Sequence, residues 1–224
     1  MRHPRLHAAA LLLAAVALLA GSTAPAAQDE CLVVDDFSRG RVGAFPPDWR
    51  VREDGGRAVY TVQAEGGRRF LRARSEGLGI QAGRQFEWDL RAYPVLAWSW
   101  RLRAFPRGAD EKDGPNDSAL AVYMLVPHSR VRGPKAVKYI WSERVPRGTR
   151  LESNYGLTKV RVLRSGAAAR GGWVEERVNV RDDYLAFFEE SEVPRPAGIA
   201  VLTDADDTRS VAEGDYADFR VCRN

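Results

Sequence analysis

Carboxylates are the abundant reactive groups of this sequence, and three of them follow one apolar segment. Asp204, Asp206 and Asp207 come directly after the run 199–203. A hard cation such as Ca²⁺ takes about six to eight oxygen ligands, so this loop would need further oxygens from carbonyls, water or Asp117. A structural calcium site at Asp204, Asp206 and Asp207 is thus one role open to the loop, turn capping by the same side chains is the favoured interpretation, and the sequence indicates no other cofactor.

Two other roles for these carboxylates stay open. Aspartate side chains in turns accept hydrogen bonds from nearby backbone N–H groups, which would make the loop purely structural. Acid–base hydrolysis of a saccharide instead needs two carboxyl groups about 5 to 9 Å apart across a cleft. Asp117, Asp204 and Asp206 are the candidates for that chemistry.

The sequence offers little for nucleophilic catalysis. After residue 7 the only histidine is His128, and no Gly-x-Ser-x-Gly segment precedes it. The two cysteines, Cys31 and Cys222, lack the Cys-x-x-Cys spacing of redox pairs. Because an even pair in an exported chain is typical of a disulfide, we expect these two to be bonded. These features favour a protein that is not an enzyme.

Four aromatic side chains share a spacing that places them in pairs on strand faces. Trp98 and Trp100 stand two residues apart, as do Tyr139 and Trp141. Side chains two apart in a strand point to the same face, so each pair belongs either to a core or to a platform for a flat ligand. Flanking leucines favour the core for the tryptophans. The candidate ligand-binding residues are Trp98, Trp100, Arg101, Tyr139 and Trp141.

Short strands must position these residues. Alternating or continuous apolar segments predict strands near 31–37, 59–62, 70–74, 86–90, 94–103, 119–126, 136–141, 158–163, 173–180, 199–203 and 216–222. Segment 181–190 begins with two aspartates and has an apolar stripe, which predicts the one helix. Because strands and helices do not alternate, we predict an all-β fold, an antiparallel jelly-roll-like β-sandwich with one short helix.

Several motifs resemble one family. They are 93–101 (Tyr-Pro-Val-Leu-Ala-Trp-Ser-Trp-Arg), 139–142 (Tyr-Ile-Trp-Ser), 164–166 (Arg-Ser-Gly) and 199–208 (Ile-Ala-Val-Leu-Thr-Asp-Ala-Asp-Asp-Thr). Together they resemble the DUF3047 family of bacterial exported proteins, a domain of unknown function. The edges 34–37 and 215–220 are also loosely similar to galactose-binding-like jelly rolls, which implies a fold rather than an activity.

The first 27 residues have the pattern of an export signal. Arg2 and Arg5 precede an apolar run, 8–20, and small residues follow it. That run is shorter than the ~20 residues that span a bilayer, and no later apolar segment is long enough to span one either. We predict a signal peptide at 1–27, a single β-sandwich domain at 28–224 and a periplasmic or secreted location. Cleavage of this signal peptide would remove both arginines and lower the net charge of the chain from +4 to +2, which argues against a nucleic-acid partner.

Three functions remain open after these exclusions. The leading hypothesis is a non-catalytic ligand-binding protein whose partner is a glycan or another cell-envelope component. A carbohydrate-active enzyme that uses Asp117, Asp204 and Asp206 is the first alternative. A structural or assembly protein of the envelope is the second, and a large exposed apolar patch would favour it. The sequence sets neither the ligand nor the oligomeric state.

Overall fold

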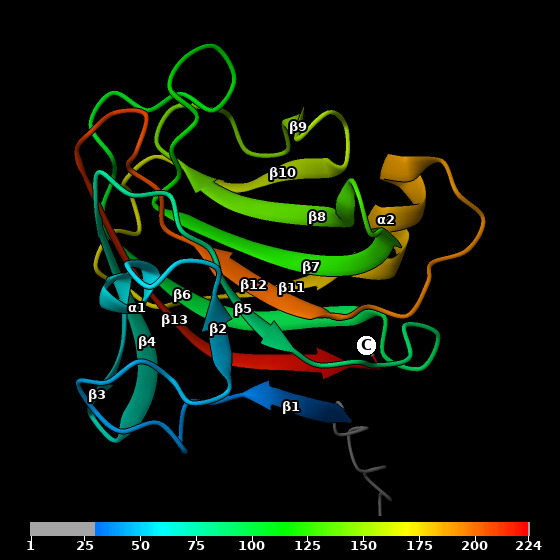
Figure 1. Ribbon diagram of the computed structural model, residues 1–224, viewed down its shortest axis with the longest axis horizontal. Helices are drawn as coiled ribbons and strands as arrows, with labels where there is room; N and C mark the ends of the chain where they lie inside the picture. Colours follow the sequence, from blue (N-terminus) through cyan, green and yellow to red (C-terminus); the bar gives the residue numbers. More distant parts are fainter. Residues whose placement is uncertain (1–29, 224) are drawn as a thin grey trace, which may run out of the picture.

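The computed structural model describes residues 30–223, which form two packed β-sheets (Figure 1). The predicted signal peptide, 1–27, lies outside the described residues. Sheet A contains β1 (Cys31–Asp35), β3 (Tyr60–Glu65), β4 (Arg68–Glu76), β6 (Val95–Ala104), β11 (Val174–Asn179) and β13 (Val211–Cys222). Sheet B contains β2 (Trp49–Val51), β5 (Ala82–Gln85), β7 (Leu120–Ser129), β8 (Gly133–Ser142), β9 (Arg150–Ser153), β10 (Thr158–Ser165) and β12 (Gly198–Leu202).

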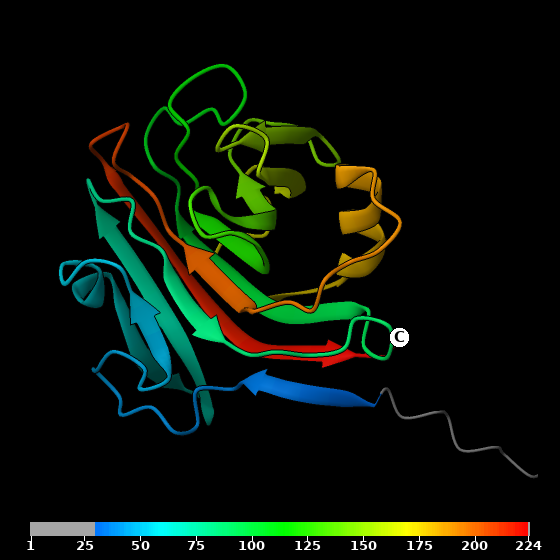
Figure 2. The same ribbon diagram turned by 45° about the vertical axis from the view of Figure 1, so that its right-hand side comes forward.

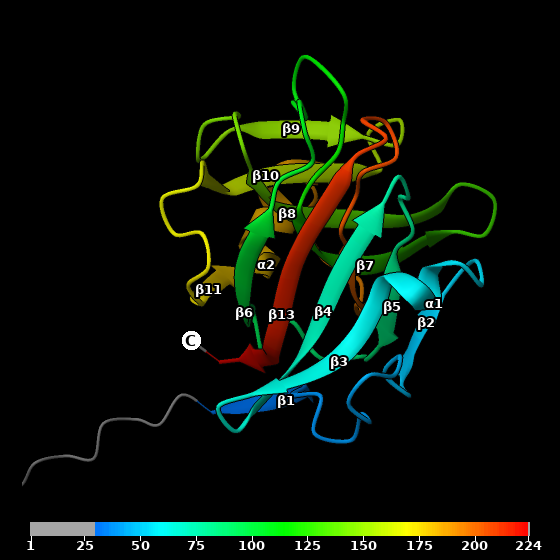
Figure 3. The same cartoon turned by 90° about the vertical axis from the view of Figure 1, so that its left-hand side faces the viewer.

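The strand order shows a two-sheet sandwich. Sheet A runs β11-β6-β13-β4-β3, with β1 beside the end of β13, and Figure 3 shows β6, β13, β4 and β3 side by side. Sheet B runs β2-β5-β12-β7-β8-β10-β9. Every pairing is antiparallel except that of β8 with β10, which is parallel. The predicted all-β sandwich is confirmed, with this one parallel pair as an addition.

Within residues 30–223, two helices accompany the sheets. The predicted helix is α2 (Val180–Phe188), whose first turn is capped by the Asn179 side chain accepting from the Asp182 N–H. A single turn, α1 (Gly56–Val59), was not predicted. No helix within residues 30–223 is long and apolar enough to cross a membrane.

One predicted strand is wrong. Segment 86–90 follows β5 without strand pairing, although Trp88 and Leu90 are buried. The Asp89 side chain accepts from the Arg91 N–H at 2.8 Å, and the Trp88 indole donates to the Tyr93 carbonyl at 3.2 Å. These bonds close a local turn, so the apolar alternation here reflects burial of a loop rather than a strand.

Aromatic side chains join the two sheets. On β6, Trp98 and Trp100 face the interior, where Trp98 contacts Tyr139 of β8 at 5.7 Å between ring centroids. The ring of Trp100 lies 5.9 Å from that of Trp141. Trp98 and Trp100 themselves meet edge to face, with ring centroids 5.3 Å apart. Large rings in such offset arrangements contribute more than their buried area alone. The predicted strand faces are confirmed, and they form the centre of the core.

The two ends of the described chain are joined. Cys31 of β1 pairs in register with Cys222 of β13, and the two form a disulfide across 191 residues of sequence. Figure 2 shows β1 lying along β13. The predicted disulfide is confirmed. Such bonds are typical of oxidising compartments, which is compatible with the predicted export.

We predict that this disulfide stabilises the fold through the unfolded chain. A closed loop of 191 residues corresponds to about 5 kcal/mol in the chain-entropy model, and about 2 to 5 kcal/mol is usual on removal of such a bond. Denaturant unfolding with and without a thiol reductant measures the loss. The double variant C31S/C222S is the control, because reductant should leave its unfolding unchanged. An unchanged midpoint in the fully reduced parent protein would contradict the prediction.

Candidate functional site

The central strands of sheet B are buried on both faces. In β7, Leu120 and Val122 face the core between the sheets. Ala121 and Tyr123 face the other way and belong to a second apolar cluster formed mainly by β7, β8, β10 and β12. These four strands lie side by side across the middle of Figure 1. The second cluster defines the outer face of sheet B, the face turned away from sheet A.

A groove runs along this outer face. It consists of three adjoining hollows of about 400, 440 and 550 Å³. The first hollow shares Leu125 and Pro134 with the second, and it shares Asn154 with the third. His128, the one histidine after residue 7, is exposed near the end of β7 and lines the second hollow. We call these three hollows together the groove.

The first hollow is lined by polar side chains that have no partner inside the protein. Within residues 30–223 these side chains form no hydrogen bond or ion pair, so their donors and acceptors are available to a ligand. They come from the turn after β2, the segment before β5, and the β9–β10 hairpin. The residues are Arg52, Glu53, Gln81, Ser153, Asn154 and Thr158.

Two apolar side chains stand at the third hollow. Tyr155 lies in the turn between β9 and β10 with a relative exposure of 102%, and Val131 lies in the β7–β8 turn at 95%. No other large hydrophobic side chain in residues 30–223 exceeds 58%. Both side chains therefore bury almost no apolar surface when the chain folds, and both are accessible to a ligand.

Ionisable side chains gather around Tyr123, which lines the first hollow of the groove. Tyr123 of β7 and Lys138 of β8 are paired in register and are 7% and 5% exposed. The Lys138 ammonium lies 5.5 Å from the centroid of the Tyr123 ring. Glu111, from the loop before β7, accepts a hydrogen bond from the Ser142 hydroxyl. Burial raises the pKa of the Glu111 carboxyl.

Asp204 has the most strongly perturbed carboxyl of this cluster. Burial raises the pKa of Asp204 to about 7, the Asp206 and Asp117 carboxylates add to the rise, and Lys138 opposes it. Burial lowers the pKa of Lys138, but the Tyr123 hydroxyl and nearby carboxylates more than offset this effect. A carboxyl group that titrates near neutral pH can both donate and accept a proton, as general acids and bases do.

Gly79 brings the wall of the groove against these carboxylates. A Cβ atom at this position would lie 2.7 Å from Asp204 Oδ1 and 2.7 Å from Asp206 Oδ2. Real Cβ atoms do not approach oxygen so closely, so any other residue at position 79 would have to displace the two carboxylates. Because Gly79 has no side chain, its backbone in the lining of the first hollow can lie close to both carboxylates.

The predicted aromatic ligand-binding residues lie in the core instead of the groove. Trp98, Trp100 and Tyr139 are 0% exposed and Trp141 is 1% exposed. The Tyr139 hydroxyl donates to Asp183 Oδ2 at 2.8 Å, which is an internal bond. Because no face of these rings meets solvent, aromatic contact with a ligand has to come from other side chains in this structure.

Arg101 is also buried, on the outer face of sheet A. Its Nε donates to Asp215 Oδ2 at 2.7 Å, and the fully buried Asp215 also accepts from Arg72 and Arg103. The ring of Trp173 lies 4.6 Å from the Arg101 guanidinium. Arg101 therefore belongs to a buried ion cluster on the sheet opposite the groove.

The acidic loop, residues 204–208 after β12, does not bring together the three carboxylates predicted as metal ligands. Oxygens of Asp117, Asp206 and Asp207 lie within 4.8 Å of one another, whereas Asp204 lies against Gly79. Asp117 accepts from the N–H groups of Asp207 and Thr208 at 3.2 and 2.8 Å, so it caps the loop. Turn capping is thus observed for Asp117, and calcium binding by this loop stays a prediction.

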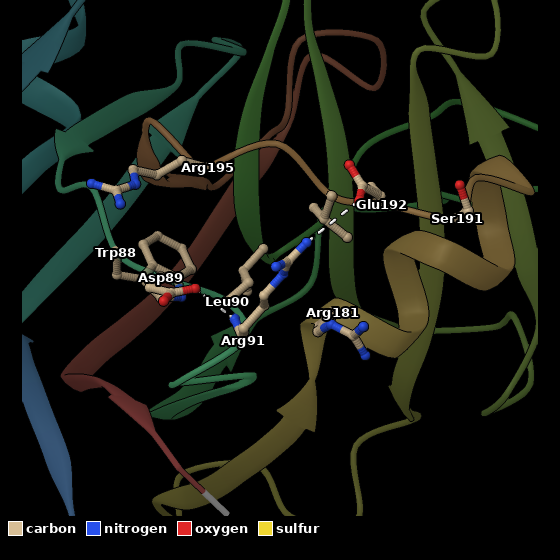
Figure 4. Close-up of a pocket in the computed structure, with 9 residues that line it drawn as sticks. Trp88, Asp89, Leu90, Arg91, Arg181, Ser191, Glu192 and Arg195 are labelled. Carbon is tan, nitrogen blue, oxygen red and sulfur yellow. Dashed lines mark hydrogen bonds and ion pairs between the residues drawn. The ribbon is translucent and has the colours of Figure 1, made fainter.

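A separate hollow of about 120 Å³ lies between the 88–91 turn and the segment after α2 (Figure 4). Arg91, Arg181 and Arg195 line it. Their guanidinium groups point in different directions in Figure 4, and Arg91 pairs with Glu192 at 3.4 Å. Because the three cations do not converge, this hollow is a poor site for a single anion.

Sequence reasoning missed most of the groove. Tyr123 and Lys138 face each other only because of the β7–β8 register, which the sequence does not show. The turn Ser153-Asn154-Tyr155-Gly156 did carry a signal, since Asn and Gly favour turns and an aromatic residue between them is unusual.

Comparisons with known proteins match one family. The sequence profile of the family described as "Protein of unknown function (DUF3047)" matches residues 48–220. No curated protein matches the sequence. Among solved structures, the carbohydrate-binding module TmCBM61 in complex with β-1,4-galactotriose is similar at a TM-score of 0.39 and 12% identity, over 81% of this chain and 92% of that one. The family 11 xylanase from Neocallimastix patriciarum is similar at 0.32 and 11%, over 80% and 93%.

We predict that Asp204 makes the stability of the fold depend on pH. Its pKa is about 7 in the folded protein and 3.8 in the unfolded chain, so the folded state binds the proton more tightly. Stability should fall as pH rises from about 4 to about 7 and then level off. Urea unfolding between pH 4 and 8 measures this slope.

Asp204→Asn should remove this part of the slope and raise the unfolding midpoint at pH 8. Asp54→Asn is the matched control, because Asp54 is exposed and makes no side-chain contact within residues 30–223. Equal slopes in the parent protein and in Asp204→Asn would contradict the prediction.

Proposed function

Since the chain belongs to the DUF3047 family, whose function is unknown, we propose its function from the groove itself: the protein binds a saccharide there without converting it. The set of unpartnered polar side chains in the first hollow carries this proposal. Saccharides present many hydroxyl groups at short intervals, and each needs a donor or an acceptor once it leaves water. Guanidinium, carboxylate, amide and hydroxyl groups together supply both.

The shape of the groove supports an oligosaccharide as the ligand. A pocket for one small ligand is usually a single concave cavity. Here three hollows adjoin along the outer face of sheet B, and the third offers apolar side chains next to polar ones. A chain of several sugar units fits this extended arrangement, and a glycan of the cell envelope is the ligand class that we propose.

We predict that Arg52→Ala weakens saccharide binding without affecting the fold. Arg52 is exposed, lines the first hollow, and its side chain forms no hydrogen bond, ion pair or ring contact within the described chain. Losing one charged hydrogen bond should lower the affinity about tenfold or more. Calorimetric titration with β-1,4-linked oligomers of glucose, galactose, xylose, mannose and N-acetylglucosamine, and with envelope glycan fragments, measures the effect.

Arg41→Ala is the matched control, since Arg41 is also exposed without a side-chain partner in residues 30–223 but does not line the groove. Each titration is run with calcium and with a chelator, which also tests the acidic loop as a metal site. Absence of binding to every glycan would reject the proposal and favour an assembly role in the envelope.

Hydrolysis of the bound saccharide is the second candidate function, and the position of Asp204 favours it. Its carboxyl has a pKa of about 7 and lies with the Asp206 carboxyl against Gly79, a residue that lines the first hollow. A carboxyl with a raised pKa is suited to the general-acid role in the carboxyl pair that glycoside hydrolysis uses. Asp117 fits this role less well, because both of its oxygens cap backbone N–H groups.

If the protein is a hydrolase, Asp204→Asn should abolish release of reducing ends from a bound oligosaccharide while leaving its affinity nearly unchanged. The physical reason is that an amide cannot transfer the proton that a carboxyl does. A reducing-sugar assay beside the calorimetric titration separates the two effects. Turnover that persists in both Asp204→Asn and Asp206→Asn would reject these residues as catalytic groups.

A further inference from the structure

The turn between β9 and β10 carries an aromatic residue in an unfavourable backbone conformation. Asn154, Tyr155 and Gly156 have φ angles of 50°, 54° and 80°. Glycine adopts this left-handed region freely and asparagine tolerates it, whereas a bulky side chain pays a steric penalty there. Two of the three residues are therefore suited to the turn, and Tyr155 is not.

The Tyr155 side chain makes no stabilising interaction that would offset this steric penalty. Its side chain is fully exposed, and it forms no hydrogen bond or ring contact with any residue between 30 and 223. Glycine or asparagine at position 155 would relieve the strain without losing a contact. Strained residues that the fold does not need are a feature of binding and catalytic sites.

The surroundings of Tyr155 identify a ligand class. Val131, Arg132, Asn154 and Leu157 line the same hollow, and Asn154 joins it to the polar first hollow. The hollow thus combines an exposed ring and an aliphatic side chain with a guanidinium and an amide. A pyranose unit has matching chemistry, because one face of the ring presents C–H groups and its edge presents hydroxyls.

We propose that Tyr155 is the stacking platform of the groove, on which the C–H face of one pyranose unit of the ligand lies. This inference rests on the proposed saccharide binding and deepens it. Arg132 and Asn154 bind the hydroxyls at the edge of that unit, and the rest of the oligosaccharide extends past Asn154 into the first hollow.

The test combines stability and affinity for the same variants. Tyr155→Gly should raise the melting temperature by a few degrees, because the strain is relieved. The same variant should bind the oligosaccharide selected from the panel above at least about tenfold more weakly. Tyr155→Phe keeps the ring and should bind nearly as well as the parent protein.

Arg209→Gly is the matched control for the backbone. Arg209 is also exposed and left-handed, with a φ of 49°, and it lies outside the groove. Its replacement should raise the melting temperature without changing the affinity. Opposite signs of the stability and affinity effects at position 155 alone would support the inference.

Three results would overturn the inference. Unchanged affinity in Tyr155→Gly, with weakened binding in Arg52→Ala, would leave saccharide binding intact and remove Tyr155 from the site. A change of oligomeric state in Tyr155→Gly without an affinity change would assign the ring to contacts between copies of the chain. Failure of the parent protein to bind any glycan would overturn this inference together with the proposed function.

Discussion

The packing of Trp98 and Trp100 of sheet A against Tyr139 and Trp141 of sheet B is the contact on which the rest of the structure depends. It holds the two sheets face to face at the centre of the core. Side chains alternate along a strand, so once one face of β8 is committed to this core, the other face must point outward. That face carries Lys138 and forms the floor beneath the groove.

Two aspartates, one fully and one partly buried, show how surroundings decide what a carboxyl group can do. Asp215 is completely buried and accepts hydrogen bonds from three arginines, which keep its charge compensated. Asp204 is partly buried beside two other carboxylates, and its pKa rises to about 7. The first arrangement holds sheet A together, whereas the second places a proton-exchanging group beside an open groove.

The groove and the strained turn are consistent with a single use. The polar side chains of the first hollow have no partner in the described chain, Val131 and Tyr155 bury almost no surface, and the left-handed backbone of Tyr155 carries a steric penalty. These three groups of groove residues lie on the outer face of sheet B or at its rim. A ligand with hydroxyl groups and an apolar face accounts for all three features together.

The sequence by itself determined the all-β class, the disulfide and the inward faces of the strands that carry Trp98 and Tyr139. Period-two alternation and cysteine count are local signals that survive any arrangement of the sheets. Whether those rings met solvent, and which residues faced Lys138 or lined the groove with Asn154, depended on which strands paired and in which register. Contacts between residues far apart in the chain decide such matters, so only the tertiary structure moved the candidate site from the tryptophans to the outer face of sheet B.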